Sequence, residues 1–120
     1  MPLRQLFQQM FLDLYGYVWK TPEPANKELQ PFNLIISKNE RFITPNDTIG
    51  VVIKDWTRSI GVNSVIKAEH DAEEAGLDDV ILVGNRFSLQ AKGMAQRMGI
   101  RLISKGELVV TYQEQQPAIF

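Results

Sequence analysis

The sequence predicts an α/β domain with a central mixed β-sheet flanked by helices. Three observations support this class. The chain starts with an amphipathic helical pattern, continues through β-rich segments separated by polar turns, and then alternates strand-like with helix-like segments. Its 120 residues fit a single domain, which we place at residues 1–112, followed by a flexible tail at residues 113–120.

The first helix is predicted at residues 3–14, where apolar side chains recur at three- and four-residue steps before Gly16. Leu12 and Tyr15 fall outside this stripe, which suggests that they contact a second copy of the chain or another protein. Residues 21–31 contain three prolines and are expected to form an irregular connection. The apolar stripe of the first predicted helix consists of Leu3, Leu6, Phe7, Met10, Phe11 and Leu14.

The next part of the chain predicts an antiparallel meander of three strands. Strands are expected at residues 32–37, 42–44 and 48–56, with polar turns between them. The third segment is rich in β-branched residues, which indicates the central strand of the sheet.

The second half predicts parallel strands linked by helices. A helix capped by Asn63 or Ser64 is expected to end at Gly76, and the wholly apolar strand at residues 80–83 is expected to be covered on both faces. Ser88 is expected to cap a second helix that ends at Gly99, before a strand at residues 100–103. The order is therefore α-β-β-β-α-β-α-β, with a parallel crossover.

Composition excludes several classes of function. Thirteen basic and fourteen acidic side chains give 13 − 14 = −1, which excludes a bulk polycation. The absence of cysteine excludes disulfides, thiol catalysis and cysteine-bound zinc, and the single histidine, His70, excludes sites with two imidazoles. Apolar runs of at most four residues and an N-terminus unlike a signal peptide lead us to expect a cytoplasmic protein without a membrane partner.

Particular residues at the junctions of these elements carry a family resemblance. The segments concerned are residues 14–18, 32–35, 51–56, 61–62, 81–83, 86–88, 100–104 and 106–108. Their order and spacing resemble the restriction-endonuclease-like (PD-(D/E)XK) superfamily and its Mrr-like branch, over roughly residues 3–109. The resemblance implies a metal-dependent phosphodiesterase fold, in which an Asp on the first strand and a Glu or Gln two residues before a Lys on the central strand hold Mg²⁺.

The chain departs from this pattern at each acidic position. Asn33 stands at the first-strand Asp, Val52 at the central-strand Glu or Gln, and Gln8 nearest to a Glu that many Mrr-like members carry on the first helix. Lys54 remains. Because strand side chains alternate, Asp55 points away from the face shared by Val52 and Lys54 and cannot replace the missing carboxylate. We therefore expect a nuclease-like scaffold without a metal cofactor.

An alternative keeps the enzyme active through relocated carboxylates. Asp47 precedes the central strand and Glu69 lies fifteen residues after Lys54, so the two are candidate Mg²⁺ ligands of an endodeoxyribonuclease. The structural interpretation of the same residues is a turn former and a rim residue of an amphipathic helix. The sequence leaves the question of catalysis open.

Phosphate binding needs cations and helix starts and does not require a metal. The candidates for contact with DNA are Lys54, Arg58, Arg86 and Ser88. In the simpler interpretation Lys54 and Arg58 are solvated charges at the strand end, Arg86 is free and Ser88 only caps a helix. The acidic run between residues 69 and 79 is expected to be a solvated face that repels phosphate. Three hypotheses follow: a DNA-binding module without cleavage, the active endonuclease, and an assembly subunit or homodimer using Leu12, Tyr15 and the C-terminal tail.

Overall fold

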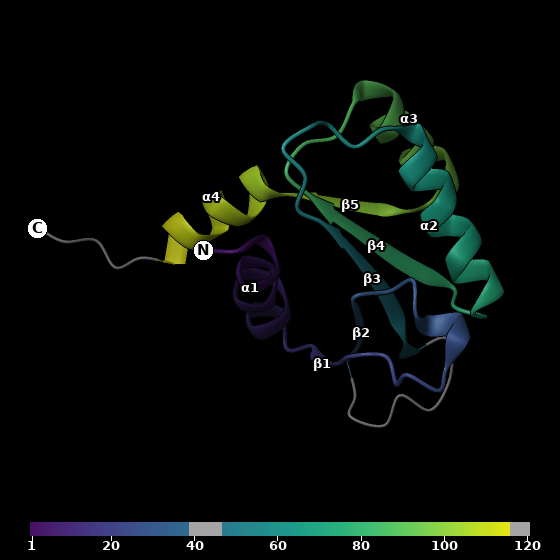
Figure 1. Cartoon of the computed structure of the whole chain (residues 1–120). Coiled ribbons are helices and arrows are strands. Elements are labelled where there is room, and N and C mark those ends of the chain that lie inside the picture. Colours follow the sequence, from purple (N-terminus) through teal and green to yellow (C-terminus); the bar gives the residue numbers. More distant parts are fainter. Residues whose placement is uncertain (39–46, 116–120) are drawn as a thin grey trace, which may run out of the picture.

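A computed structural model describes residues 1–38 and 47–115 of the chain. Its centre is a five-stranded mixed sheet in the order β1-β2-β3-β4-β5 (Figure 1). The first three strands pair antiparallel, and β3, β4 and β5 pair parallel. The predicted α/β class and parallel crossovers are confirmed, and the predicted segments at residues 32–37 and 48–56 pair antiparallel as β2 and β3. The strands are β1 (Val18–Lys20), β2 (Leu34–Ser37), β3 (Ile49–Lys54), β4 (Asp79–Gly84) and β5 (Arg101–Ser104).

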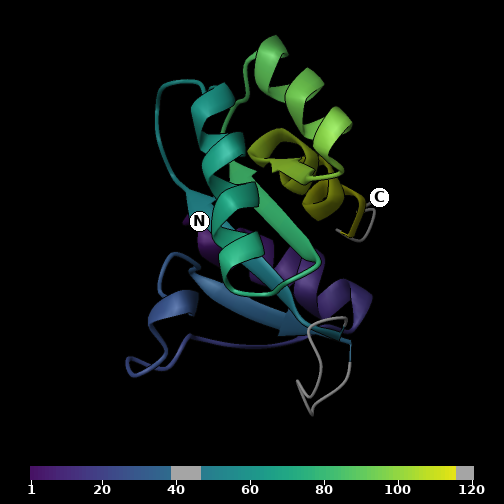
Figure 2. The same cartoon turned by 90° about the vertical axis from the view of Figure 1, so that its right-hand side faces the viewer.

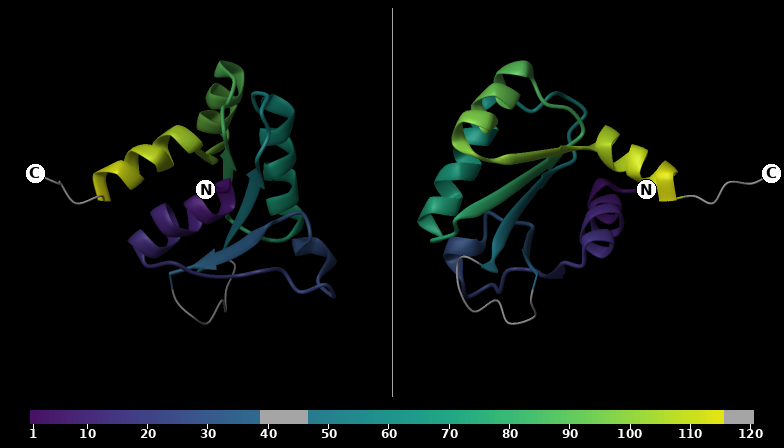
Figure 3. Two further views of the ribbon diagram at one scale, coloured as in Figure 1. Left: turned by 60° about the vertical axis from the view of Figure 1, so that its left-hand side comes forward. Right: turned by 180° about the vertical axis from the view of Figure 1, so that it is seen from behind.

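Helices cover both faces of this sheet and make three layers. Figure 2 shows α2 and α3 side by side in front of one face, and Figure 3 shows α1 and α4 on the other. No helix in the described part of the chain has the length and hydrophobicity to cross a bilayer. The helices are α1 (Leu3–Phe7), the π-helical η1 (Gln8–Asp13), the 3-10 helix η2 (Lys27–Leu29), α2 (Val62–Glu74), α3 (Leu89–Met98) and α4 (Lys105–Gln115).

Two apolar clusters fill the spaces between the layers. Val52 and Leu82 point toward Val65 and Ala91 on the α2–α3 side. Val51 belongs to the cluster on the α1–α4 side, as the alternation of strand side chains requires. All residues of β4 from Val80 onward are buried, which confirms that this strand is covered on both faces.

The first helix differs from the predicted regular one. The π-helical turn η1 advances the buried stripe by one residue, because its hydrogen bonds join residues five apart. Leu12 is therefore fully buried and Leu14 is 42% exposed, the reverse of the prediction. Leu12 cannot contact a partner, whereas Tyr15 is 52% exposed and remains a candidate.

The meander uses one strand that was not expected. β1 forms directly after the first helix, where the sequence analysis placed no strand, and pairs with β2. β2 starts at Leu34, and β3 is shorter at both ends than the predicted central strand at residues 48–56. The predicted strand at residues 42–44 lies outside the described residues.

The predicted start and end residues are confirmed for α3 and only in part for α2. Ser88 caps α3 by accepting a hydrogen bond from Ala91 N at 3.0 Å, and Gly99 ends it with a φ of 72°. α2 begins earlier than predicted, at Val62. Its N-cap is Gly61, which has no side chain, so neither of the two predicted capping residues occupies that position.

The sequence analysis missed α4, which continues to Gln115 through residues assigned to a loose tail. Ser104 and Glu107 form a reciprocal capping box at its start. Glu107 N donates to Ser104 Oγ at 3.2 Å, and Ser104 N donates to Glu107 Oε1 at 3.3 Å. This S-x-x-E pattern before Leu108 was the available signal. Residues 116–120, the rest of the predicted tail, lie outside the described part.

Candidate functional site

The candidate site lies where the three parallel strands end. The loops that follow β3 and β4 are tied together there by side-chain and main-chain hydrogen bonds. Asn85 Nδ2 donates to Asp55 Oδ1 at 2.9 Å and to Trp56 O at 2.6 Å, and Arg86 Nη2 donates to Thr57 O at 2.5 Å. Figure 1 shows both loops at the same edge of the sheet. The predicted binding residues Lys54, Arg58, Arg86 and Ser88 are therefore all carried by the end of β3 and these two loops.

Lys54 and Arg58 each lie against the ring of Trp56. Lys54 Nζ lies 4.5 Å from the ring centroid, and Arg58 Cζ lies 4.4 Å from it. Trp56 is half-buried and packs against the core on the α2–α3 side, so it provides a fixed support for both cations. Each cation–π contact is worth about 0.5–1 kcal/mol at an exposed site. We call these three residues the cation–tryptophan cluster.

Asn33 directly precedes β2, is hydrogen-bonded to β3 and offers little to a metal. Its side-chain Oδ1 accepts a hydrogen bond from Ile53 N at 2.7 Å, and its own N–H donates to Val51 O at 2.8 Å. These two bonds flank Val52, which is only 8% exposed and lies in the α2–α3 core. The structure thus brings together the two positions at which the resemblance expects metal ligands. One offers an amide oxygen that is already engaged, and the other offers a hydrocarbon side chain.

The alternative carboxylates are spread along the fold. Asp47 precedes β3 and Lys54 ends it, and the five residue steps of β3 at about 3.3 Å each span roughly 17 Å. Glu69 is half-buried on α2, about 10 Å along the helix axis from its first turn. Gln8 lies in the helix on the opposite face from Val52. Within the described ranges, no group of three or more acidic or histidine side chains is placed to hold a metal ion.

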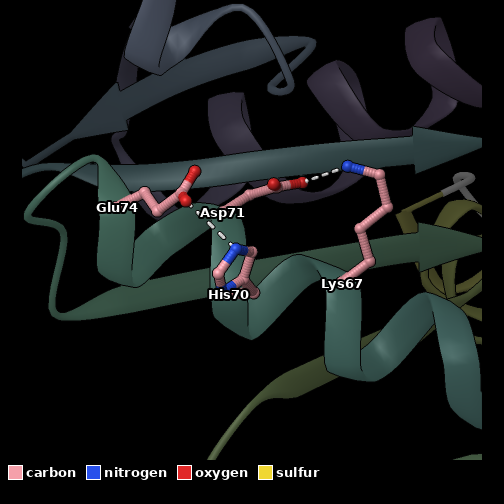
Figure 4. Close-up of polar contacts among 4 residues, drawn as sticks. All are labelled: Lys67, His70, Asp71 and Glu74. Carbon is pink, nitrogen blue, oxygen red and sulfur yellow. Dashed lines mark hydrogen bonds and ion pairs between the residues drawn. The ribbon is translucent and has the colours of Figure 1, made fainter.

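The acidic helix α2 carries two side-chain pairs, shown in Figure 4. Lys67 Nζ lies 2.8 Å from Asp71 Oδ2, and His70 Nε2 lies 3.1 Å from Glu74 Oε1. His70 is exposed. Asp71 is only 8% exposed and therefore does not belong to the solvated face to which its neighbours were assigned. Its pairing with Lys67 offsets part of the negative charge of this helix.

The sequence analysis missed a cavity of about 610 Å³ beside the cation–tryptophan cluster. Its walls come from the β4–α3 loop, α3, the end of β5 and the start of α4. Lys92 and Gln96 line it from α3, and Ser104 and Glu107 line it from the α4 capping box. No local pattern indicates such a cavity, because the residues that form it are distant in the sequence.

Comparison with known proteins identifies the fold and no family. No family model matches the chain, and no curated protein matches its sequence. A crystal structure of a protein of unknown function, AF1548, matches 90% of the chain with a TM-score of 0.68 and 15% sequence identity. The chain spans 64% of the length of that protein. The chain therefore shares its α/β fold with that protein.

Proposed function

We propose that this protein has a restriction-endonuclease-like fold and binds nucleic acid, DNA in particular, without metal-dependent cleavage. The observation that carries the proposal is the cation–tryptophan cluster at the carboxyl edge of the sheet. Its two cations lie on one ring, and neither forms an ion pair with a residue in the described part of the chain. Fixed cations of this kind suit the phosphates of a nucleic-acid backbone.

The surroundings of the cluster favour the same ligand. A second cavity, of about 460 Å³, is lined by Trp56, Arg58 and the first residues of α2. No side chain caps α2 there. The N–H of Ser64 donates to Gly61 O, and the N–H groups of Val62 and Asn63 remain available to solvent or to an anion. Phosphate oxygens at this position would meet Arg58 and the positive end of the helix dipole together.

The chemistry of the former metal positions supports the absence of cleavage. Mg²⁺ is held by anionic oxygens, whereas Asn33 and Val52, where the resemblance expects metal ligands, supply an engaged amide and a buried isopropyl group. On this proposal Lys54 acts as a phosphate-binding cation, because these two side chains offer no anionic ligand to an ion that would activate water.

Fluorescence anisotropy with labelled duplex and branched DNA, in EDTA, tests the binding. We expect affinity to fall steeply with added salt, with a slope set by the number of phosphates contacted. The double variant Lys54→Ala, Arg58→Ala should flatten this slope by about two phosphate contacts. Lys27→Ala, an exposed lysine of η2 outside both loops, is the matched control and should leave the slope unchanged.

Two results would contradict the proposal. Binding that is absent in EDTA, or that ignores salt, would exclude a phosphate interface at this edge. Plasmid nicking by the pure protein in Mg²⁺ or Mn²⁺, abolished by Lys54→Ala, would instead support the endonuclease with Asp47 and Glu69 as relocated ligands.

A further inference from the structure

The 610 Å³ cavity has the size and position of a small-molecule site. Ligand cavities usually enclose about 300–1,000 Å³, and α/β sheets commonly hold ligands beyond the carboxyl ends of parallel strands. This cavity lies beyond the end of β4, beneath α3 and against β5. It is a different space from the smaller cavity beside Trp56, although Ser59 lines both.

One part of the wall is apolar. Phe87 is 9% exposed, and Ala95 and Ile100 are also buried, so they form a firm floor. Leu102 and Ser104 stand two residues apart on β5 and therefore point to the same side, toward α3. A flat, partly apolar group such as an aromatic heterocycle suits this floor.

Two cations lie at the same cavity. Arg86 is fixed by its hydrogen bond to Thr57 O, which leaves other N–H groups of the guanidinium unused, and Lys92 projects from the first turn of α3. Neither forms an ion pair with a residue that the structure describes. Glu107 also lines the cavity, but its Oε1 is occupied by the capping box. The balance of charge at the cavity favours an anionic ligand.

Asn85 also lines the cavity. Its side-chain Nδ2 donates to Asp55 Oδ1 and to Trp56 O, which fixes this part of the wall. Its Oδ1 is buried without a donor and lies out of reach of a ligand in the cavity.

We propose that this cavity binds a nucleoside monophosphate, either as a free nucleotide or as the 5′-phosphorylated end of a nucleic-acid strand. Arg86 and Lys92 hold the phosphate, and the base lies on the apolar floor near Asn85. This site goes beyond the proposed backbone-binding function, since it depends on Lys92 and the floor, whereas that function depends on the cation–tryptophan cluster.

Calorimetry and amide chemical-shift mapping with deoxyadenosine 5′-monophosphate test the site, with inorganic phosphate and deoxyadenosine as the partial ligands. We expect the nucleotide to bind more tightly than either part and to shift amides at residues 85–87, 92–96 and 104–107. Lys92→Glu should weaken binding at least about tenfold, the effect of one charge-assisted hydrogen bond. Arg97→Glu makes the same charge change on α3 outside the cavity and should stay within about twofold.

Competition distinguishes the two sources of the ligand. A single-stranded oligonucleotide with a 5′-phosphate should displace the nucleotide if the site takes strand ends, and its 5′-hydroxyl counterpart should not. If neither oligonucleotide competes while the nucleotide still binds, the ligand is the free nucleotide. Both outcomes support the cavity.

Three outcomes would overturn the cavity proposal. The first is absence of nucleotide binding by the unmodified protein, and the second is equal weakening by Lys92→Glu and Arg97→Glu. The third is loss of nucleotide binding in the Lys54→Ala, Arg58→Ala variant, which would place the ligand on Trp56. If the double variant still binds the nucleotide but has lost duplex binding, both proposals are supported. If the unmodified protein binds the nucleotide but no duplex, only the cavity proposal is supported.

Discussion

Replacing Leu12 with alanine should destabilise the protein far more than replacing Leu14. A regular helix over residues 3–14 would bury Leu14 and expose Leu12. The π-helical turn reverses this, so that Leu12 is fully buried beside Phe7 and Leu34 while Leu14 is 42% exposed. The pair therefore tests the phase of the first helix, and with it the conclusion that Leu12 is unavailable to a partner.

The expected magnitudes follow from burial. Truncation of a fully buried leucine costs about 2–5 kcal/mol, because transfer energy is lost and a cavity remains. At Leu14 much of the side chain already lies in water and no enclosed cavity forms, so we expect at most about 1 kcal/mol. For a domain of this size, 1 kcal/mol corresponds to roughly 4 °C in Tm. Leu12→Ala should thus melt about 8–20 °C lower than the parent, and Leu14→Ala no more than about 4 °C lower.

Urea unfolding followed by far-ultraviolet circular dichroism measures both free energies under the same conditions. The two variants share the same chemical change two residues apart, so each controls for the other. A cost at Leu14 equal to or larger than that at Leu12 would refute the π-helical phase and restore Leu12 as a candidate contact.

Close approaches and local hydrogen bonds give three further tests. Gly84→Ala should lower the free energy of unfolding by about 1–3 kcal/mol, because the new methyl group would collide with a buried isoleucine of the β3–α2 loop. Gly93→Ala, inside α3 and free of clashes, should instead raise that free energy by at most about 1 kcal/mol. Urea unfolding checks the two signs, and a shared sign would contradict the close approach. Ser104→Ala removes the α4 cap and should cost about 1 kcal/mol, visible as fraying of α4 in amide exchange; an unaltered helix would argue against the capping box. Asn33→Ala should cost about 0.5–1.5 kcal/mol and speed exchange of the Ile53 amide, and unchanged protection there would mean that the bond contributes nothing.

The sequence was most informative where a physical effect acts within a few residues. Ser88 and Gly99 mark the two ends of α3 because a side-chain cap and a left-handed glycine are local features. The buried strand β4 was readable because four successive apolar side chains need cover on both faces. The start of α4 was equally local, since its Ser and Glu stand three residues apart, and it could have been predicted.

Tertiary structure decided the features that join distant segments. Asn33 is tied to Ile53 across twenty residues, so its amide oxygen is engaged for a reason that no local pattern reveals. Leu12 and Asp71 are buried because of what packs over them, which amphipathic periodicity alone does not specify. That Asn33 and Val52, where the resemblance expects metal ligands, carry no carboxylate could be read from the sequence. The support of two cations by Trp56 and the cavity under α3 exist only because the ends of β3, β4 and β5 meet at one edge.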